Sequence, residues 1–217
     1  MTVRRIFANG QWMRREMSDA DYARMLQGQR EFEQVKGAAL QAAIKAIQAH
    51  HDDASTLVIR YSLLMNSENR LPAVLELIEQ APSSIFWPTF FTVWCSCDDT
   101  WRHRKKLLIA LLRQRKAALP IAFMSDADRI WLDSLPDPIP VFRGCSRARA
   151  KGLAWTTDKH IAAGFARGHR SISVADAVVV AAMTPKSAVF AAITERKEQE
   201  LVLYPARCHI LSMHKVE

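Results

Sequence analysis

Three prolines within five residues, Pro136, Pro138 and Pro140, divide the chain into two parts of different character. Proline lacks a backbone N–H and fixes φ, so a helix that reaches this segment ends there. Before the segment, apolar periodicity and composition predict helices over about residues 22–51, 54–64, 71–80, 102–116 and 125–135. After it, short apolar runs predict strands over about 141–144, 153–157, 177–183, 188–193, 201–204 and 208–213, with one helix over 158–167. The expected fold class is α+β, with a mostly helical region over residues 1–135 and a β-rich region over 136–217.

Several residues carry local expectations inside the helical region. Gly28 and Gly37 are candidate breaks in its first long helix, and Pro72 is expected at the start of a helix, where proline is tolerated. Three tryptophans recur every seven residues and would share one face of a helix: Trp87, Trp94 and Trp101. Core packing is the first interpretation of this stripe, and a platform for base stacking is the alternative.

Composition limits the class of protein. With 217 residues, 49% of them hydrophobic, the chain can bury a sizeable core. It has no run of 18 apolar residues and no secretory signal at the N-terminus, so we expect no membrane partner and a cytoplasmic location. Four cysteines form no disulfide framework, and Cys95 and Cys97 lack the second pair that a zinc site would need, so no metal is expected.

The positive charge is concentrated toward the C-terminus. The chain has a net charge of +8. From Ile139 onward it contains 12 Lys and Arg and 6 Asp and Glu, so the net charge of this part is +6. A field of this sign attracts phosphates, whether of a nucleotide or of a nucleic acid.

Two glutamates one residue apart, Glu198 and Glu200, precede the apolar run from Leu201 to Tyr204. If the extended backbone begins at Glu198, both side chains lie on one face of the strand. Two carboxylates at the start of a buried strand are costly unless a partner or ligand holds them. The pair is therefore the first candidate for a chemical site, and a solvated strand end is the alternative.

Two further features precede the glutamates in the β-rich region. An arginine ends a strand in Phe142-Arg143-Gly144, and hydroxyl groups lead into a helix in Trp155-Thr156-Thr157-Asp158. In this order, the three features resemble the arginine–serine–glutamate class of mono-ADP-ribosyltransferases, the group that includes cholera-like and clostridial toxins. The resemblance covers about 80 residues, from Pro138 to Val216. It departs from the family at Trp155-Thr156-Thr157, where the family usually has serine–threonine–serine.

The resemblance implies a split, twisted sheet and NAD as co-substrate. Breaking the bond between nicotinamide and ribose creates a cationic sugar, and Glu200 would stabilise that charge. Arg143 would bind the phosphates of NAD, and Thr156 or Thr157 would hydrogen-bond Glu200 and hold its rotamer. Glu198 would handle the acceptor, and an acid at this position favours arginine on a protein.

Two residues beside these complete the expected NAD site. Gly144 would allow the backbone to approach the ligand closely, and Trp155 would help to wall the nicotinamide pocket. The expected activity is transfer of ADP-ribose from NAD to a macromolecule, either protein or nucleic acid, with an antitoxin or inhibitor as a further partner. A NAD glycohydrolase with water as acceptor, and a basic nucleic-acid-binding module without turnover, remain open alternatives.

Overall fold

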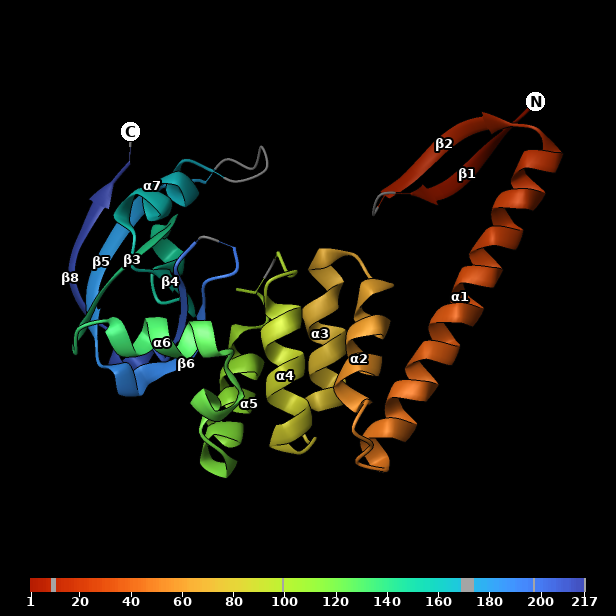
Figure 1. Ribbon diagram of the computed structural model, residues 1–217. Helices are drawn as coiled ribbons and strands as arrows, with labels where there is room; N and C mark the ends of the chain where they lie inside the picture. Colours follow the sequence, from red (N-terminus) through yellow and green to blue (C-terminus); the bar gives the residue numbers. More distant parts are fainter. Residues whose placement is uncertain (9–10, 99, 169–173, 197, 217) are drawn as a thin grey trace.

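The computed structural model describes residues 1–8, 11–98, 100–168, 174–196 and 198–216. A hairpin and a long helix stand at one end, shorter helices lie in the middle, and a six-stranded sheet with one helix on it forms the other end (Figure 1). The hairpin and the helices before the sheet are β1 (Thr2–Ala8), β2 (Gln11–Met17), α1 (Asp19–Gln48), α2 (Ala54–Leu63), α3 (Ser67–Ile78), α4 (Ser83–Trp94), α5 (Arg104–Ala117) and α6 (Asp126–Ser134). The sheet strands and their helix are β3 (Ile139–Ser146), β4 (Ala154–Thr156), α7 (Lys159–Arg167), β5 (Ala177–Thr184), β6 (Val189–Ile193), β7 (Glu200–Leu203) and β8 (His209–Lys215).

Two local expectations for the helical region are wrong. Helix α1 runs unbroken through Gly28 and Gly37, because each glycine costs only about 1 kcal/mol and a 30-residue helix tolerates that. Helix α3 begins at Ser67, with Pro72 in its interior. The Asn66 side chain accepts a hydrogen bond of 2.9 Å from the Asn69 N–H, and this cap sets the start of α3 earlier than proline does.

The structure contains an N-terminal hairpin that the sequence analysis did not predict. Its strands pair from Thr2 with Met17 to Ala8 with Gln11. The dipeptide Asn9-Gly10 between the strands is a strong hairpin signal in the sequence, although these two residues lie outside the described part of the chain.

All six expected strands of the β-rich region, and the helix between them, are confirmed. The strands pair antiparallel in the order β6-β7-β4-β3-β5-β8, and the structure is of the mixed α+β class. The Asp158 side chain caps α7 by accepting from the His160 N–H at 2.7 Å. The expected end of β7 is also confirmed: the strand ends at Leu203, and Pro205 comes two residues later.

The sheet is joined weakly at its centre. Strands β3 and β5 pair over eight residues, whereas β3 and β4 pair only at Phe142 and Thr156. The sheet therefore splits between β3 and β4, next to the candidate residues.

The helices pack directly on the sheet. One hydrophobic cluster joins Trp87 and Trp94 of α4 to Phe190 of β6 and Val202 of β7. Trp87 and Trp94 are both buried, which confirms the core interpretation for these two residues of the stripe, while Trp101 lies beyond α4. Within the described residues, no helix is long and apolar enough to cross a membrane.

Candidate functional site

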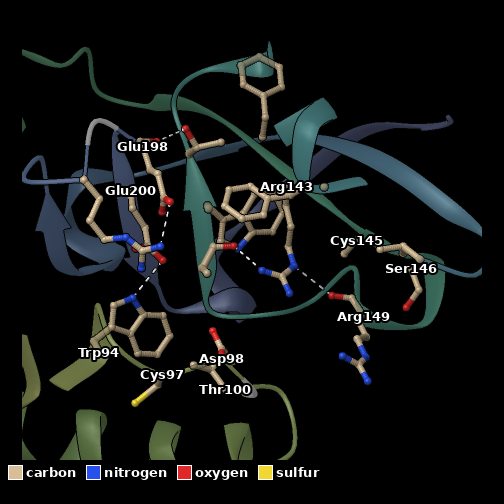
Figure 2. Close-up of a pocket in the computed structure, with 18 of the residues that line it drawn as sticks. Trp94, Cys97, Asp98, Thr100, Arg143, Cys145, Ser146, Arg149, Glu198 and Glu200 are labelled. Atoms are coloured by element: carbon tan, nitrogen blue, oxygen red, sulfur yellow. Dashed lines mark hydrogen bonds and ion pairs between the residues drawn. The ribbon is translucent and has the colours of Figure 1, made fainter. Parts of the chain in front are cut away.

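A cavity of about 500 Å³ opens at the split in the sheet (Figure 2). Its walls come from β3, β4 and the start of β7, and from the segment that follows α4. Six of the seven candidate residues line it: Arg143, Gly144, Trp155, Thr156, Glu198 and Glu200. Thr157, the seventh, borders the lining residue Thr156 without lining the cavity itself.

Glu200 is the first residue of β7, where it pairs with Thr156 of β4 on one side and Ile193 of β6 on the other. Its Oε1 accepts a hydrogen bond of 3.0 Å from Nε1 of Trp94. Burial raises the pKa of Glu200 to about 7, and the nearby charge of Glu198 contributes to the rise. The Trp94 hydrogen bond opposes this shift, because it stabilises the ionised carboxylate. The site thus holds a carboxyl group that titrates near neutrality.

Trp94 is a site residue that the sequence did not reveal, and Arg196 is another. Trp94 ends α4, and its side chain is only 3% exposed. An indole N–H is a donor without acceptor capacity, so its position fixes one oxygen of Glu200. The seven-residue tryptophan spacing signals a buried face but cannot tell which ring meets a carboxylate 106 positions away.

The two threonines contact residues 198 and 199, and not the Glu200 carboxylate that was expected. The Thr156 hydroxyl donates to the backbone oxygen of Glu198 at 2.7 Å, and the Thr157 hydroxyl donates to the side-chain oxygen of Gln199 at 2.7 Å. Neither of these bonds reaches the Glu200 carboxylate, so the expected direct contact is replaced by an anchor on the preceding residues. Thr156 also accepts from the Asp158 N–H at 3.0 Å, which ties the segment to the start of α7.

The backbone at Gln199 explains why the extended run starts later than expected. Gln199 has a φ of 47°, in the left-handed region that a non-glycine residue adopts only at a cost. Strand β7 therefore begins at Glu200, and simple strand alternation does not relate Glu198 to Glu200. Both still line the cavity, because the turn at Gln199 brings Glu198 to it.

Glu198 is already bound to a guanidinium. Its Oε1 lies 3.0 Å from Nη2 of Arg196, and Nη1 of Arg196 donates to the backbone oxygen of Cys95 at 2.7 Å. Arg196 thus connects the glutamate segment to the end of α4. In Figure 2 the Glu198 and Glu200 side chains lie on the same side of the site, with Trp94 below them.

Arg143 bridges the split in the sheet. Its Nε donates to the backbone oxygen of Arg149 at 3.1 Å, and Nη1 donates to that of Ala154 in β4. A Cβ at position 152 would lie 2.3 Å from Nη2 of Arg143, so Gly152 leaves the room that the guanidinium occupies. Burial lowers the pKa of Arg143, but a guanidinium starts so high that it stays charged.

Gly144 and Trp155 have structural roles in addition to lining the cavity. A Cβ at Gly144 would lie 1.7 Å from the backbone oxygen of Ala162, so the glycine is required for α7 to pack on β3. Trp155 is 3% exposed and donates from Nε1 to the Gly152 oxygen at 2.9 Å. Contact of either residue with a ligand stays a prediction.

The charges of the cavity wall are mixed. Three arginines and three carboxylates line it: Arg143, Arg149, Arg196, Asp98, Glu198 and Glu200. Among the described residues, no three His, Cys, Asp or Glu side chains are grouped to hold a metal ion. A wall of this kind suits a polar ligand that carries both anionic and cationic groups.

Comparison with known proteins found no match for this chain. No family model, no curated protein and no solved structure matched the chain.

Proposed function

We propose that this protein is an NAD-dependent mono-ADP-ribosyltransferase that releases nicotinamide and transfers ADP-ribose to a macromolecule. The observation that carries the proposal is the meeting of Arg143, Thr156 and Glu200, from three neighbouring strands, in one cavity. These residues lie 57 positions apart at most in the sequence, and the strand order brings them together.

The chemistry required of Glu200 fits its surroundings. As the bond between nicotinamide nitrogen and ribose C1′ breaks, the nitrogen keeps the electron pair and positive charge spreads over C1′ and the ring oxygen. An ionised Glu200, oriented by Trp94, would stabilise that charge in a site of low polarity. With a pKa of about 7, a large fraction of Glu200 is ionised at neutral pH.

The rest of the cavity supports NAD as the substrate. Its volume of about 500 Å³ falls within the range of small-molecule and cofactor sites. Arg143 uses two of the five N–H donors of a guanidinium on backbone oxygens, so it retains capacity to bind a phosphate. Arg149, exposed at the same wall, adds a second positive charge for the pyrophosphate.

The contact between Glu198 and Arg196 favours a guanidinium as acceptor. Glu198 holds the Arg196 side chain at 3.0 Å, and an incoming protein arginine would take the place of Arg196 in this interaction. Nucleic acid remains the second candidate acceptor. A cytoplasmic location and an antitoxin or inhibitor partner remain predictions.

Incubation of the purified chain with NAD labelled in its adenylate part, in a cell lysate, tests the proposal. We expect label on macromolecules and release of nicotinamide, with protease or nuclease digestion showing which class carries the label. Glu200→Gln should lower both signals by about 100-fold or more, because the developing charge loses its anionic partner.

Glu198→Gln is the matched control, since it makes the same chemical change two residues away. We expect it to reduce transfer more than nicotinamide release. Free labelled ADP-ribose without labelled macromolecules would identify a glycohydrolase instead. Unchanged turnover in folded Glu200→Gln would refute the assigned role of Glu200, and no nicotinamide release from the parent chain would refute the activity.

A further inference from the structure

The N-terminal hairpin is a two-stranded ribbon with four arginines set in opposite pairs. The register places Arg4 opposite Arg15 and Arg5 opposite Arg14. Like charges directly opposite each other destabilise an antiparallel pair, and a two-stranded hairpin is marginal even without them. The repulsion within the two pairs therefore works against the stability of the ribbon, and a bound anion would relieve it.

The two faces of the ribbon differ. Arg4 lies on the face toward α1, where it pairs with Asp19 and stacks 4.3 Å from the ring centre of Tyr22. Ile6, on the same face by strand alternation, is buried. This inner face fixes the ribbon to the start of α1, at the end of that helix remote from the six-stranded sheet (Figure 1).

The outer face carries exposed cations and an exposed aromatic ring. Strand alternation and register place Val3, Arg5, Trp12, Arg14 and Glu16 together on this face, which therefore carries two cations and one acid. Trp12 is 62% exposed, and the Arg5 guanidinium lies 5.1 Å from its ring centre. Within the described part of the chain, no acidic side chain forms an ion pair with Arg5, Arg14 or Arg15.

We propose that this ribbon binds duplex DNA in the major groove. The major groove of B-form DNA admits a two-stranded ribbon, and arginine forks bind the flanking phosphates. On the face directed at the groove, Arg5 and Arg14 supply positive charge and Trp12 supplies an apolar surface. Arg15 is exposed on the other face, opposite Arg4, and adds to the positive charge of the ribbon. The inference is separate from the proposed ADP-ribosyl transfer, because it involves a surface built from other residues.

Fluorescence anisotropy with a labelled 20-base-pair DNA duplex, titrated with the full-length chain at several salt concentrations, tests the proposal. The triple variant Arg5→Gln, Arg14→Gln, Arg15→Gln should bind at least about tenfold more weakly, with a salt slope of log K shallower by about 2 to 3. The triple lysine variant at the same positions keeps the charge and should retain most of the affinity and slope. Circular dichroism of each variant reports whether the fold is intact.

A charge-matched control removes three cations from α5: Lys105→Gln, Arg113→Gln, Lys116→Gln. It lowers the net charge equally and should weaken binding by only about twofold. Equal losses in the two glutamine variants would overturn the proposal in favour of non-specific attraction, and an unchanged ribbon variant would overturn it directly. Two further results would also overturn the proposal. One is equal affinity for a 20-base-pair RNA duplex, because the major groove of RNA is deep and narrow and excludes side chains. The other is binding to phosphatidylserine vesicles that depends on the ribbon, without binding to DNA.

Discussion

At the scale of the residue, Glu200 gives the protein a pH-dependent stability. Its pKa rises from an ordinary 4.5 to about 7 in the folded chain, so the folded state holds the proton more tightly than the unfolded state does. The contribution of Glu200 to the free energy of unfolding is therefore fully present below about pH 4.5 and is lost as the pH rises through about 7. The loss amounts to at most about 3 kcal/mol. Urea unfolding of the parent chain and Glu200→Gln at pH 5 and pH 8 measures it, and Gln should remove most of the difference.

An identical pH dependence of unfolding in the parent chain and in Glu200→Gln would show that a group other than Glu200 is responsible. A companion variant, Trp94→Phe, removes the donor that favours the ionised carboxylate, so the pKa of Glu200 should rise further. The acid side of the proposed activity's pH profile should then move to higher pH, by up to about one pH unit, a shift that simple loss of packing does not produce.

At the scale of the element, the packing of α7 on β3 depends on Gly144. A Cβ there would lie 1.7 Å from the Ala162 oxygen and 2.6 Å from the Ala166 nitrogen, both backbone atoms of α7. Gly144→Ala must therefore displace the helix, and we expect a loss of about 1–3 kcal/mol or more in the free energy of unfolding. Gly28→Ala is the matched control, because no atom lies within 4 Å of its added Cβ and it should stabilise α1 by about 0.5–1 kcal/mol. Equal effects of the two substitutions in urea unfolding would contradict the packing role.

At the scale of the whole molecule, the helical region and the sheet share one core. The cluster that holds Trp87 and Val58 also holds Phe190, Ala191 and Val202 of the sheet. Removing residues 1–135 would expose these apolar side chains and take Trp94 away from Glu200. We expect the remaining fragment, residues 136–217, to lack a cooperative thermal transition and to bind a hydrophobic dye. A sharp transition with dispersed NMR signals from the fragment would instead show that it folds independently.

The sequence predicted the elements of the β-rich region well and the helical region less completely. Strand signals are local: apolar runs, Pro205 after β7 and the cap at Asp158 each act within a few residues. The start of α3 also has a local signal, the Asn66 cap, but Pro72 gave a competing one. The hairpin was missed even though Asn9-Gly10 is typical of one, because charged residues such as Arg4 and Arg15 interrupt the apolar pattern.

The candidate site was predicted as a set of residues, without its contacts. Arg143, Thr156 and Glu200 line one cavity, but no periodicity in the sequence could place Trp94 against Glu200 or direct the threonine hydroxyls to Glu198 and Gln199. By itself, the sequence determined where most helices and strands form and which side chains carry chemistry. The tertiary structure alone decided which of them meet, because strand order, the split beside β3 and the pKa of Glu200 arise from contacts and burial between residues far apart in the chain.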